Sequence, residues 1–327
     1  MNAPARIPAT IVTGFLGAGK TTLIRDLIAR AKGRRIAIIV NEFGDMGFDG
    51  ALIADCDDDH RPDEIIELTN GCICCTVADE FLPTIEKLLA RDPAPEHIVI
   101  ETSGLALPQP LVRAFAWPGV KHRVTVDGVV TVVDAAAVAA GRFVPETAVA
   151  NHDDPIEELF EDQLRCADLI VISKSDLVSA ESFAETTALV KREARAGTSV
   201  VNGRGAPADM LFGIAASAED DMGGRESHHD LEGEEHDHDD FDSIVVPVPV
   251  APSLDTLKAR VLDALTLPGV LRVKGRVAIA GKAAPAVVQA VGPRVEVAFA
   301  PGATASGLVV IGLRTMDRAA IARALAG

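Results

Sequence analysis

The chain has 327 residues, a length that suggests one large domain and a smaller one. Its hydrophobic content of 48% is ample for packed cores, and no apolar run reaches the roughly 18 residues that a membrane span requires. The formal net charge is −17, but twelve acidic residues and a single arginine lie between Glu219 and Asp242. Outside that stretch the charge is ordinary for a soluble protein, which argues against nucleic-acid binding and against a polybasic membrane patch.

Cysteine usage indicates the compartment. Three of the five cysteines are nearly adjacent, so they do not form a disulfide framework and instead suit metal ligation in a reducing environment. The stretch from Met1 to Pro8 lacks a basic segment followed by an apolar one, so we expect no secretory signal. Together these features predict a cytoplasmic protein.

Short β-rich runs alternate with helical patterns through the first two hundred residues. The candidate strands are Ala9–Thr13, Arg35–Val40, His97–Ile100, Val129–Val133, Leu169–Ser173 and Thr198–Asn202. The candidate helices are Thr21–Ala31, Asp79–Arg91, Pro155–Arg165 and Ala180–Ala194. Because several of these strands are continuously apolar, they are typical of a parallel sheet covered on both faces. We therefore predict a doubly wound α/β domain with a mostly parallel sheet over residues 1–215.

The composition changes after Met210. Residues 216–243 are acidic and nearly free of large apolar groups, so we expect a disordered linker. Residues 244–327 predict a small α+β domain with strands at Ile244–Val250, Val270–Ala280, Ala286–Ala300 and Leu308–Leu313 and helices at Ser253–Leu265 and Asp317–Ala326. Arg272, Lys274 and Arg276 alternate along one strand face, a pattern that favours a solvated edge over a ligand site.

Residues 14–21 fit the phosphate-binding pattern G-x-x-x-x-G-K-[ST] between a strand and a helix. Backbone N–H groups in such a loop and the helix N-terminus hold phosphate oxygens, while the lysine reaches the β- and γ-phosphates and the threonine ligates Mg²⁺. The alternative is an ordinary strand–turn–helix with tight glycines. The residues that we assign to the phosphates and Mg²⁺ are Gly14, Gly17, Ala18, Gly19, Lys20, Thr21 and Thr22.

Glu101 ends an apolar strand and precedes Thr102, Ser103 and Gly104. A carboxylate there lies at the carboxyl edge of the sheet, where ligands bind in open α/β folds. It can hold Mg²⁺ directly or through water, and Gly104 can donate its backbone N–H to the γ-phosphate. The alternative is a strand-end acid that caps the next helix.

The nucleobase side of the pocket is predicted at residues 173–176, which follow another apolar strand. Asp176 can accept hydrogen bonds from both N–H groups of guanine, which favours GTP over ATP. Lys174 would lie along the base or the ribose. Ser173 stands where the usual guanine motif begins with Asn, and a plain polar turn is the alternative.

Cys72, Cys74 and Cys75 follow the turn-prone stretch Thr69-Asn70-Gly71. In an extended segment the first two thiols point the same way, and a bend lets the third join them. Thiolates select soft or borderline ions such as Zn²⁺, Co²⁺ or Cu⁺, and two or three of them leave a coordination position open for transfer. Buried inert cysteines are the alternative.

Glu42 lies in the segment Asn41-Glu42-Phe43-Gly44-Asp45 after the second strand. It could ligate the transferred metal, complete the Mg²⁺ shell or position water, or it could be a plain loop acid. The acidic linker holds four histidines that could bind divalent metals as an accessory or remain solvated, namely His228, His229, His236 and His238.

Taken together, these segments resemble the CobW-type P-loop GTPases, relatives of the hydrogenase and urease nickel-insertion GTPases. The matching pieces are Gly14–Thr22, Asn41–Asp45, Gly71–Thr76, Glu101–Gly104 and Ser173–Asp176, and residues 70–76 and 101–110 look most like the cobalamin-biosynthesis subgroup. That resemblance implies a GTPase that delivers metal, with Co²⁺ for a cobaltochelatase as the subgroup cargo.

We therefore predict a chaperone that binds Co²⁺ or Zn²⁺ in its Mg²⁺-GTP state and releases the ion to a client on hydrolysis. Intrinsic hydrolysis should be slow, because no arginine finger is identifiable; Lys20, Thr21 and Glu101 are the catalytic candidates. The alternatives are a zinc-homeostasis GTPase, a nucleotide-modulated metal buffer or sensor, and an ATP-using small-molecule kinase.

Overall fold

The computed structural model describes residues 6–30, 34–41, 64–68, 81–141, 155–204, 211–228, 230, 241–291, 294–299, 305 and 307–327. These residues form two compact units, residues 6–230 and residues 241–327, each with its own hydrophobic core. Among the described residues, no helix has the length and apolar character needed to cross a membrane.

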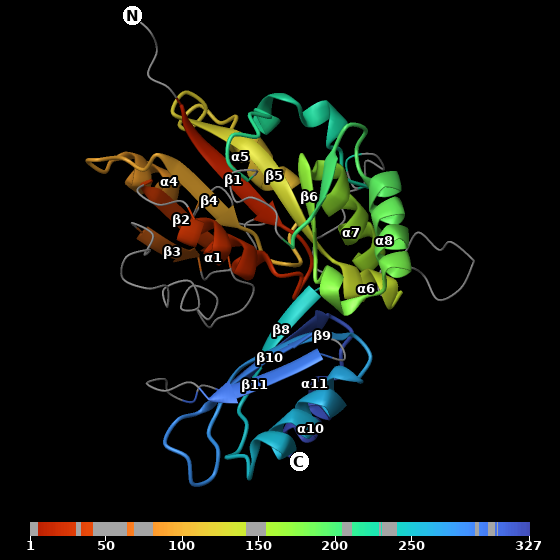
Figure 1. Cartoon of the computed structure of the whole chain (residues 1–327). Coiled ribbons are helices and arrows are strands. Elements are labelled where there is room, and N and C mark those ends of the chain that lie inside the picture. The colour runs from red at the N-terminus through yellow and green to blue at the C-terminus, as the bar shows by residue number, and fades with distance from the viewer. Residues whose placement is uncertain are drawn as a thin grey trace, which may run out of the picture. The chain divides into compact units, whose positions relative to one another are not determined.

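The first unit is built on a seven-stranded sheet in which every neighbouring pair of strands is parallel. The strand order is β3-β2-β4-β1-β5-β6-β7 (Figure 1). The strands are β1 (Ile7–Thr13), β2 (Ile36–Asn41), β3 (Glu64–Leu68), β4 (His97–Glu101), β5 (Val124–Asp134), β6 (Leu169–Ser173) and β7 (Ser199–Asn202). The predicted doubly wound α/β fold is confirmed, with β3 as a strand that the apolar pattern missed.

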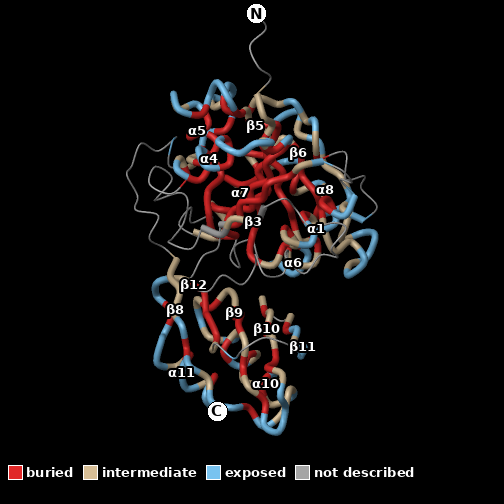
Figure 2. The backbone as a smooth tube through the Cα atoms, turned by 90° about the vertical axis from the view of Figure 1, so that its left-hand side faces the viewer, coloured by how far each residue is buried: buried red, intermediate tan, exposed pale blue. Residues whose placement is uncertain are grey.

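Helices cover both faces of this sheet. The helices are α1 (Lys20–Arg30), α4 (Leu82–Leu89), α5 (Gln109–Ala114), α6 (Ala135–Ala139), α7 (Pro155–Cys166) and α8 (Ala180–Glu193). Ile24, Leu27 and Ile28 of α1 pack on one face, while α4 and α5 pack on the other. Both faces of the central strands are therefore buried, as the red core of Figure 2 shows, which explains their continuous apolar runs.

Residues 216–228 differ from the predicted disordered linker, because the structure packs them onto the first unit. Glu219 is buried and accepts hydrogen bonds from Thr125 Oγ1 (2.6 Å) and Val126 N (2.9 Å). Arg225 is also buried and pairs with Asp168. The prediction of disorder is therefore wrong for residues 216–228, because these charges are paired with groups far away in the sequence rather than solvated.

The second unit is a five-stranded antiparallel sheet of order β11-β10-β9-β12-β8 with two helices. Its elements are β8 (Phe241–Val246), α10 (Leu254–Leu265), β9 (Val270–Val277), β10 (Ala286–Val291), β11 (Arg294–Phe299), β12 (Gly307–Leu313) and α11 (Arg318–Ala326). The predicted strand Ala286–Ala300 is instead the hairpin β10–β11. The solvated edge expected for Lys274 is wrong, since β9 is the central strand and this side chain is 1% exposed.

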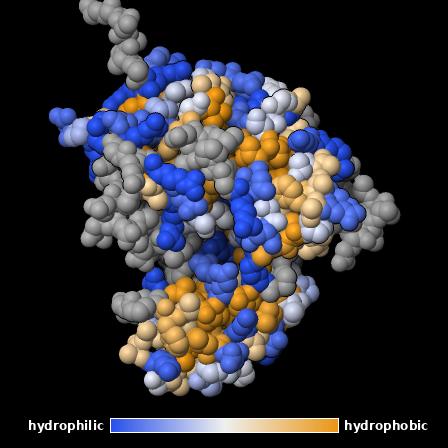
Figure 3. All heavy atoms as spheres, viewed as in Figure 1, coloured by the Kyte–Doolittle hydropathy of each residue, from blue (hydrophilic) through white to orange (hydrophobic). Residues whose placement is uncertain are grey.

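The surface of the second unit is partly apolar. Figure 3 shows hydrophobic side chains gathered on the side of this unit turned to the viewer. Among its described residues, the exposed large apolar side chains are Val245, Val250 and Phe299.

Candidate functional site: a phosphate loop at the carboxyl edge of the sheet

The loop between β1 and α1 needs glycine for two separate reasons. Gly14, Gly17 and Gly19 all have positive φ angles (130°, 72° and 102°), which L side chains rarely adopt. A Cβ at Gly14 would lie 2.2 Å from the carbonyl oxygen of Val132, so the loop packs directly on β5. The loop then enters α1, which begins at Lys20 and presents its N-terminal N–H groups to this edge of the sheet.

Lys20 lies across the loop rather than out in solvent. Its side chain is buried, and its ammonium donates to the carbonyl oxygens of Gly14 (2.8 Å) and Phe15 (3.3 Å). Ala18 is buried in the same turn, and Thr22 is exposed on the first turn of α1. A cation and a helix N-terminus therefore meet at one short loop, which is the arrangement that holds a polyphosphate.

Thr21 and Glu101 come together from α1 and the end of β4. The Thr21 hydroxyl donates to Glu101 Oε1 at 2.9 Å, and Glu101 is buried. A hydroxyl and a carboxylate oxygen side by side are hard ligands of the kind that Mg²⁺ prefers. The sequence placed these two residues in separate motifs, and the fold brings them into contact.

The chain after Glu101 packs on the phosphate loop. Thr102 N donates to Val12 O at 3.0 Å, and the Thr102 hydroxyl donates to Thr13 Oγ1 at 2.9 Å. A Cβ at Gly104 would lie 2.7 Å from Leu16 N, so only glycine allows this approach. Gly104 therefore lies directly against the phosphate loop.

Ser173 and Lys174 approach the same loop from the end of β6. Ser173 Oγ donates to Ala18 O at 2.6 Å, and Lys174, in a left-handed conformation with φ of 55°, donates from Nζ to Gly17 O at 2.5 Å. Asp176 follows in a single 3₁₀ turn, Ser175–Leu177, and is exposed. The predicted nucleobase segment thus lies against the predicted phosphate segment.

Similarity to known proteins agrees with this geometry. The family model described as CobW/HypB/UreG, nucleotide-binding domain, matches residues 8–202, and the one described as Cobalamin synthesis protein cobW C-terminal domain matches residues 241–327. The chain belongs to the CobW/HypB/UreG family. Membership confirms the predicted enzyme class, a GTPase.

Two relatives of this family cover nearly the whole chain. "Zinc chaperone CobW" of Sinorhizobium sp is 50% identical over 98% of this chain and 96% of its own length. "Zinc chaperone CobW" of Pseudomonas aeruginosa is 45% identical over 99% of this chain and 92% of its own length. Among solved structures, Zn(II)-bound YjiA GTPase from E. coli aligns over 98% of both chains with a TM-score of 0.44 and 22% identity.

Asp134 lies next to the predicted nucleobase segment, although the sequence motifs did not include it. Lys174 Nζ lies 2.7 Å from Asp134 Oδ2, while Asp134 Oδ1 accepts from the N–H groups of Ala136 and Ala137 and caps α6. The signal was present, because Asp134 ends an apolar strand and precedes a run of alanines. This carboxylate holds Lys174 beside the phosphate loop.

Most of the predicted transition-metal ligands lie outside the described residues: Glu42, Cys72, Cys74, Cys75, His229, His236 and His238. Within the part of the chain that the structure describes, no group of three or more His, Cys, Asp or Glu side chains is arranged to hold a metal ion. His228 is described, and its ring nitrogens lie 2.9 Å from Asp162 Oδ1 and 3.1 Å from Glu161 Oε2. The Asp162 contact is the main reason why the pKa of His228 is raised.

Proposed function

We propose that this chain is a GTP-dependent metal chaperone that binds a transition metal in its Mg²⁺-GTP state and releases it to a client protein on hydrolysis. The observation that supports the proposal is the contact of Thr21 with Glu101 beside the buried Lys20, because these side chains would serve a polyphosphate and Mg²⁺ at the same edge of the sheet. When Mg²⁺ is bound it neutralises charge on the β- and γ-phosphates. The loop N–H groups from Gly14 to Gly19 and the Lys20 ammonium would hold the same phosphates.

The preference for GTP rests on the segment after β6. Ser173 and Lys174 fix this segment to the carbonyl groups of the phosphate loop, which leaves Asp176 exposed at the next turn. In that position its carboxylate would accept from the two N–H groups of guanine, and adenine offers no such pair. Replacing Asp176 by Asn should therefore weaken GTP binding and leave ATP binding unchanged.

The cargo that we propose is Zn²⁺, bound by Cys72, Cys74 and Cys75. Both full-length relatives carry the name zinc chaperone, and thiolates bind Zn²⁺ more tightly than Co²⁺ at equal availability. Delivery of Co²⁺ to a cobaltochelatase, the cargo of the cobalamin-biosynthesis subgroup, stays a prediction. Glu42 and the linker histidines are further candidate ligands.

The deciding experiment measures Zn²⁺ and Co²⁺ affinity in the presence of GDP, a non-hydrolysable GTP analogue or a non-hydrolysable ATP analogue. We expect metal to bind more tightly with the GTP analogue than with GDP, because only a difference in affinity between the two states can drive release. The double variant Cys74→Ser/Cys75→Ser should abolish the difference, and Cys56→Ser, outside the thiol cluster, should retain it.

Three results would count against delivery. Equal metal affinity in all nucleotide states would indicate a metal buffer. Tight GTP-dependent binding by the double variant would move the ligands elsewhere in the chain. Transfer of the γ-phosphate to a metabolite instead of water would indicate a kinase.

A further inference from the structure

A single turn of α7 contacts three segments that are distant in sequence. Gln163 is fully buried on this turn, and its side-chain amide donates to Ala106 O at 3.2 Å and to Gly104 O at 3.4 Å. Its backbone carbonyl accepts from the hydroxyl of Thr131 at 2.8 Å, which fixes the turn to β5. Gln163 is therefore anchored on the sheet and holds the loop that packs against the phosphate loop.

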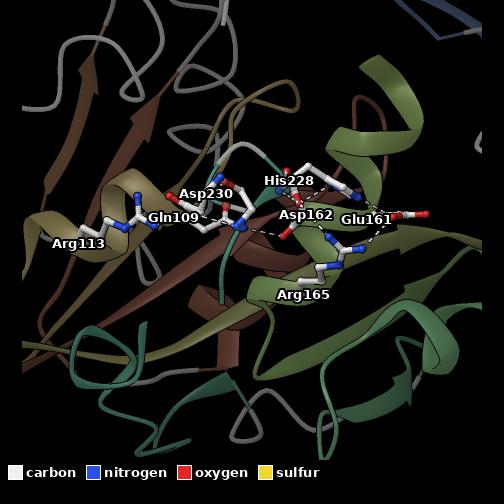
Figure 4. Close-up of polar contacts among 8 residues, drawn as sticks. Gln109, Arg113, Glu161, Asp162, Arg165, His228 and Asp230 are labelled. Atoms are coloured by element: carbon white, nitrogen blue, oxygen red, sulfur yellow. Dashed lines mark hydrogen bonds and ion pairs between the residues drawn. The ribbon is translucent and has the colours of Figure 1, made fainter. Parts of the chain in front are cut away.

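The neighbouring residue of the same turn, Asp162, contacts the other two segments (Figure 4). Its carboxylate is buried and accepts from the backbone N–H of His228 at 3.0 Å, and the imidazole of His228 lies against it. Its backbone carbonyl accepts from the side chain of Gln109, the first residue of α5, at 3.0 Å. Asp162 thus connects α7 to the end of the 211–228 segment and to α5.

Two buried side-chain amide oxygens next to this turn accept no hydrogen bond from the described residues. Gln163 Oε1 and Gln109 Oε1 have no hydrogen-bond partner among the described residues, although both side chains are almost completely buried. A buried acceptor without a donor is costly, so a second position of the 104–108 loop that turned a backbone N–H toward Gln163 would recover that cost. A second position of the loop would therefore be stabilised by a hydrogen bond that this position lacks.

We propose that Gln163 is a positioning residue. Its hydrogen bonds to the Gly104 loop would change when the loop moves, and the Asp162–Gln163 turn would transmit this change to the 211–228 segment. We call this connection the relay. The proposal rests on the proposed function, because it is the γ-phosphate that would move the loop. Coupling between two sites is reciprocal. If the bound nucleotide shifts the position of the 211–228 segment, a substitution at His228 that shifts this segment should in turn change the preference for GTP over GDP.

The first test is hydrogen–deuterium exchange of the full chain with saturating GDP or non-hydrolysable GTP analogue. Wild type should show a nucleotide-dependent difference in the protection of amides in residues 211–228. Gln163→Met, which keeps the volume and removes the amide, should lose the difference. Gln109→Met is the matched control: it removes an equally buried amide whose described hydrogen bond goes to Asp162 O and not to the Gly104 loop, and it should keep the difference.

A second test avoids the interior, in case Gln163→Met does not fold. His228→Ala should change the ratio of the Kd for GDP to the Kd for the GTP analogue by about fivefold or more. The control His122→Ala, at an exposed histidine, should leave the ratio unchanged. The proposal is overturned if wild type shows no nucleotide-dependent protection of residues 211–228, if both glutamine variants behave alike, or if His228→Ala leaves the ratio unchanged.

These outcomes separate the relay from the proposed function. Failure to bind GTP, or a metal affinity that is the same with GDP and with the GTP analogue, would refute the proposed function itself. Intact GTP-dependent metal binding without any effect at residues 211–228 would refute the relay alone.

Discussion

The buried imidazole of His97 predicts a specific loss of stability in acid. His97 begins β4 and is 4% exposed, its Nε2 lies 2.8 Å from Thr10 Oγ1, and its ring stacks edge-on against Phe212. Because the Thr10 hydroxyl gives its one proton to Leu211 O, the neutral imidazole donates its Nε2–H to Thr10. Burial is the main reason why the pKa of His97 is lowered to about 4, with Arg34 acting in the same direction and Asp127 opposing it.

The sign and size of the effect follow from proton linkage. The unfolded chain, with an ordinary histidine pKa of 6.5, binds the proton more tightly than the folded chain does. The contribution of neutral His97 is therefore complete above pH 6.5 and is lost as the pH falls toward 4. A difference of this size between the two pKa values corresponds to about 3 kcal/mol over the whole window.

The assay is urea unfolding at several pH values between 8 and 4.5, followed by the fluorescence of Trp117, the only tryptophan of the chain. Wild type should lose stability more steeply than His97→Gln, which cannot titrate and keeps a donor for Thr10. His122→Gln, at an exposed histidine, should follow wild type. Parallel curves for wild type and His97→Gln would refute the reasoning.

Three further predictions concern other parts of the first unit. Arg225→Met should lower the free energy of unfolding of this unit by about 3 kcal/mol in urea, because among the described residues Asp168 would keep Arg195 as its one remaining cation. A loss below about 1 kcal/mol would show that the Arg225–Asp168 pair is dispensable. Cys166 should resist alkylation at pH 8 until the protein unfolds, since burial raises its pKa to about 12; peptide mapping that finds it modified in the native protein would contradict this. Glu101→Gln should reduce the rate of GTP hydrolysis by about 100-fold or more at low Mg²⁺ concentration, with partial recovery at high Mg²⁺ concentration. An unchanged Mg²⁺ dependence of this rate would show that Glu101 does not contribute to the Mg²⁺ site.

Local patterns predicted the phosphate loop and most of the sheet because the physics that shapes them is local. The positive φ angles at positions 14 and 19 require glycine. Burial of both faces of a strand requires a continuous run of apolar residues. The same patterns could not foresee that Ser173 would donate to Ala18 O, because that contact depends on the order of strands in the sheet.

Composition is a poor guide to order where charged side chains are paired with residues distant in sequence. Glu219 and Arg225 raised the polar content of the expected linker, yet both are buried against partners about 60 to 90 residues away in sequence. In the second unit, alternation of Lys274 with neighbouring arginines described one face of a strand correctly. It could not reveal that this strand is central in the sheet, because a period of two is the same at an edge and in the middle.

The contacts around Gln163 also have the magnitude that nucleotide coupling requires. A coupling free energy of about 1–3 kcal/mol changes an affinity by roughly 5- to 150-fold. One net hydrogen bond in a protein contributes about 0.5–1.5 kcal/mol, and Gln163 makes two, to Gly104 and Ala106. If this pair formed in one position of the loop and not in the other, the difference would therefore supply a coupling within that range. Replacing the amide by an apolar group of the same volume should remove the coupling while leaving nucleotide binding at the phosphate loop, which does not contact Gln163 through any described hydrogen bond.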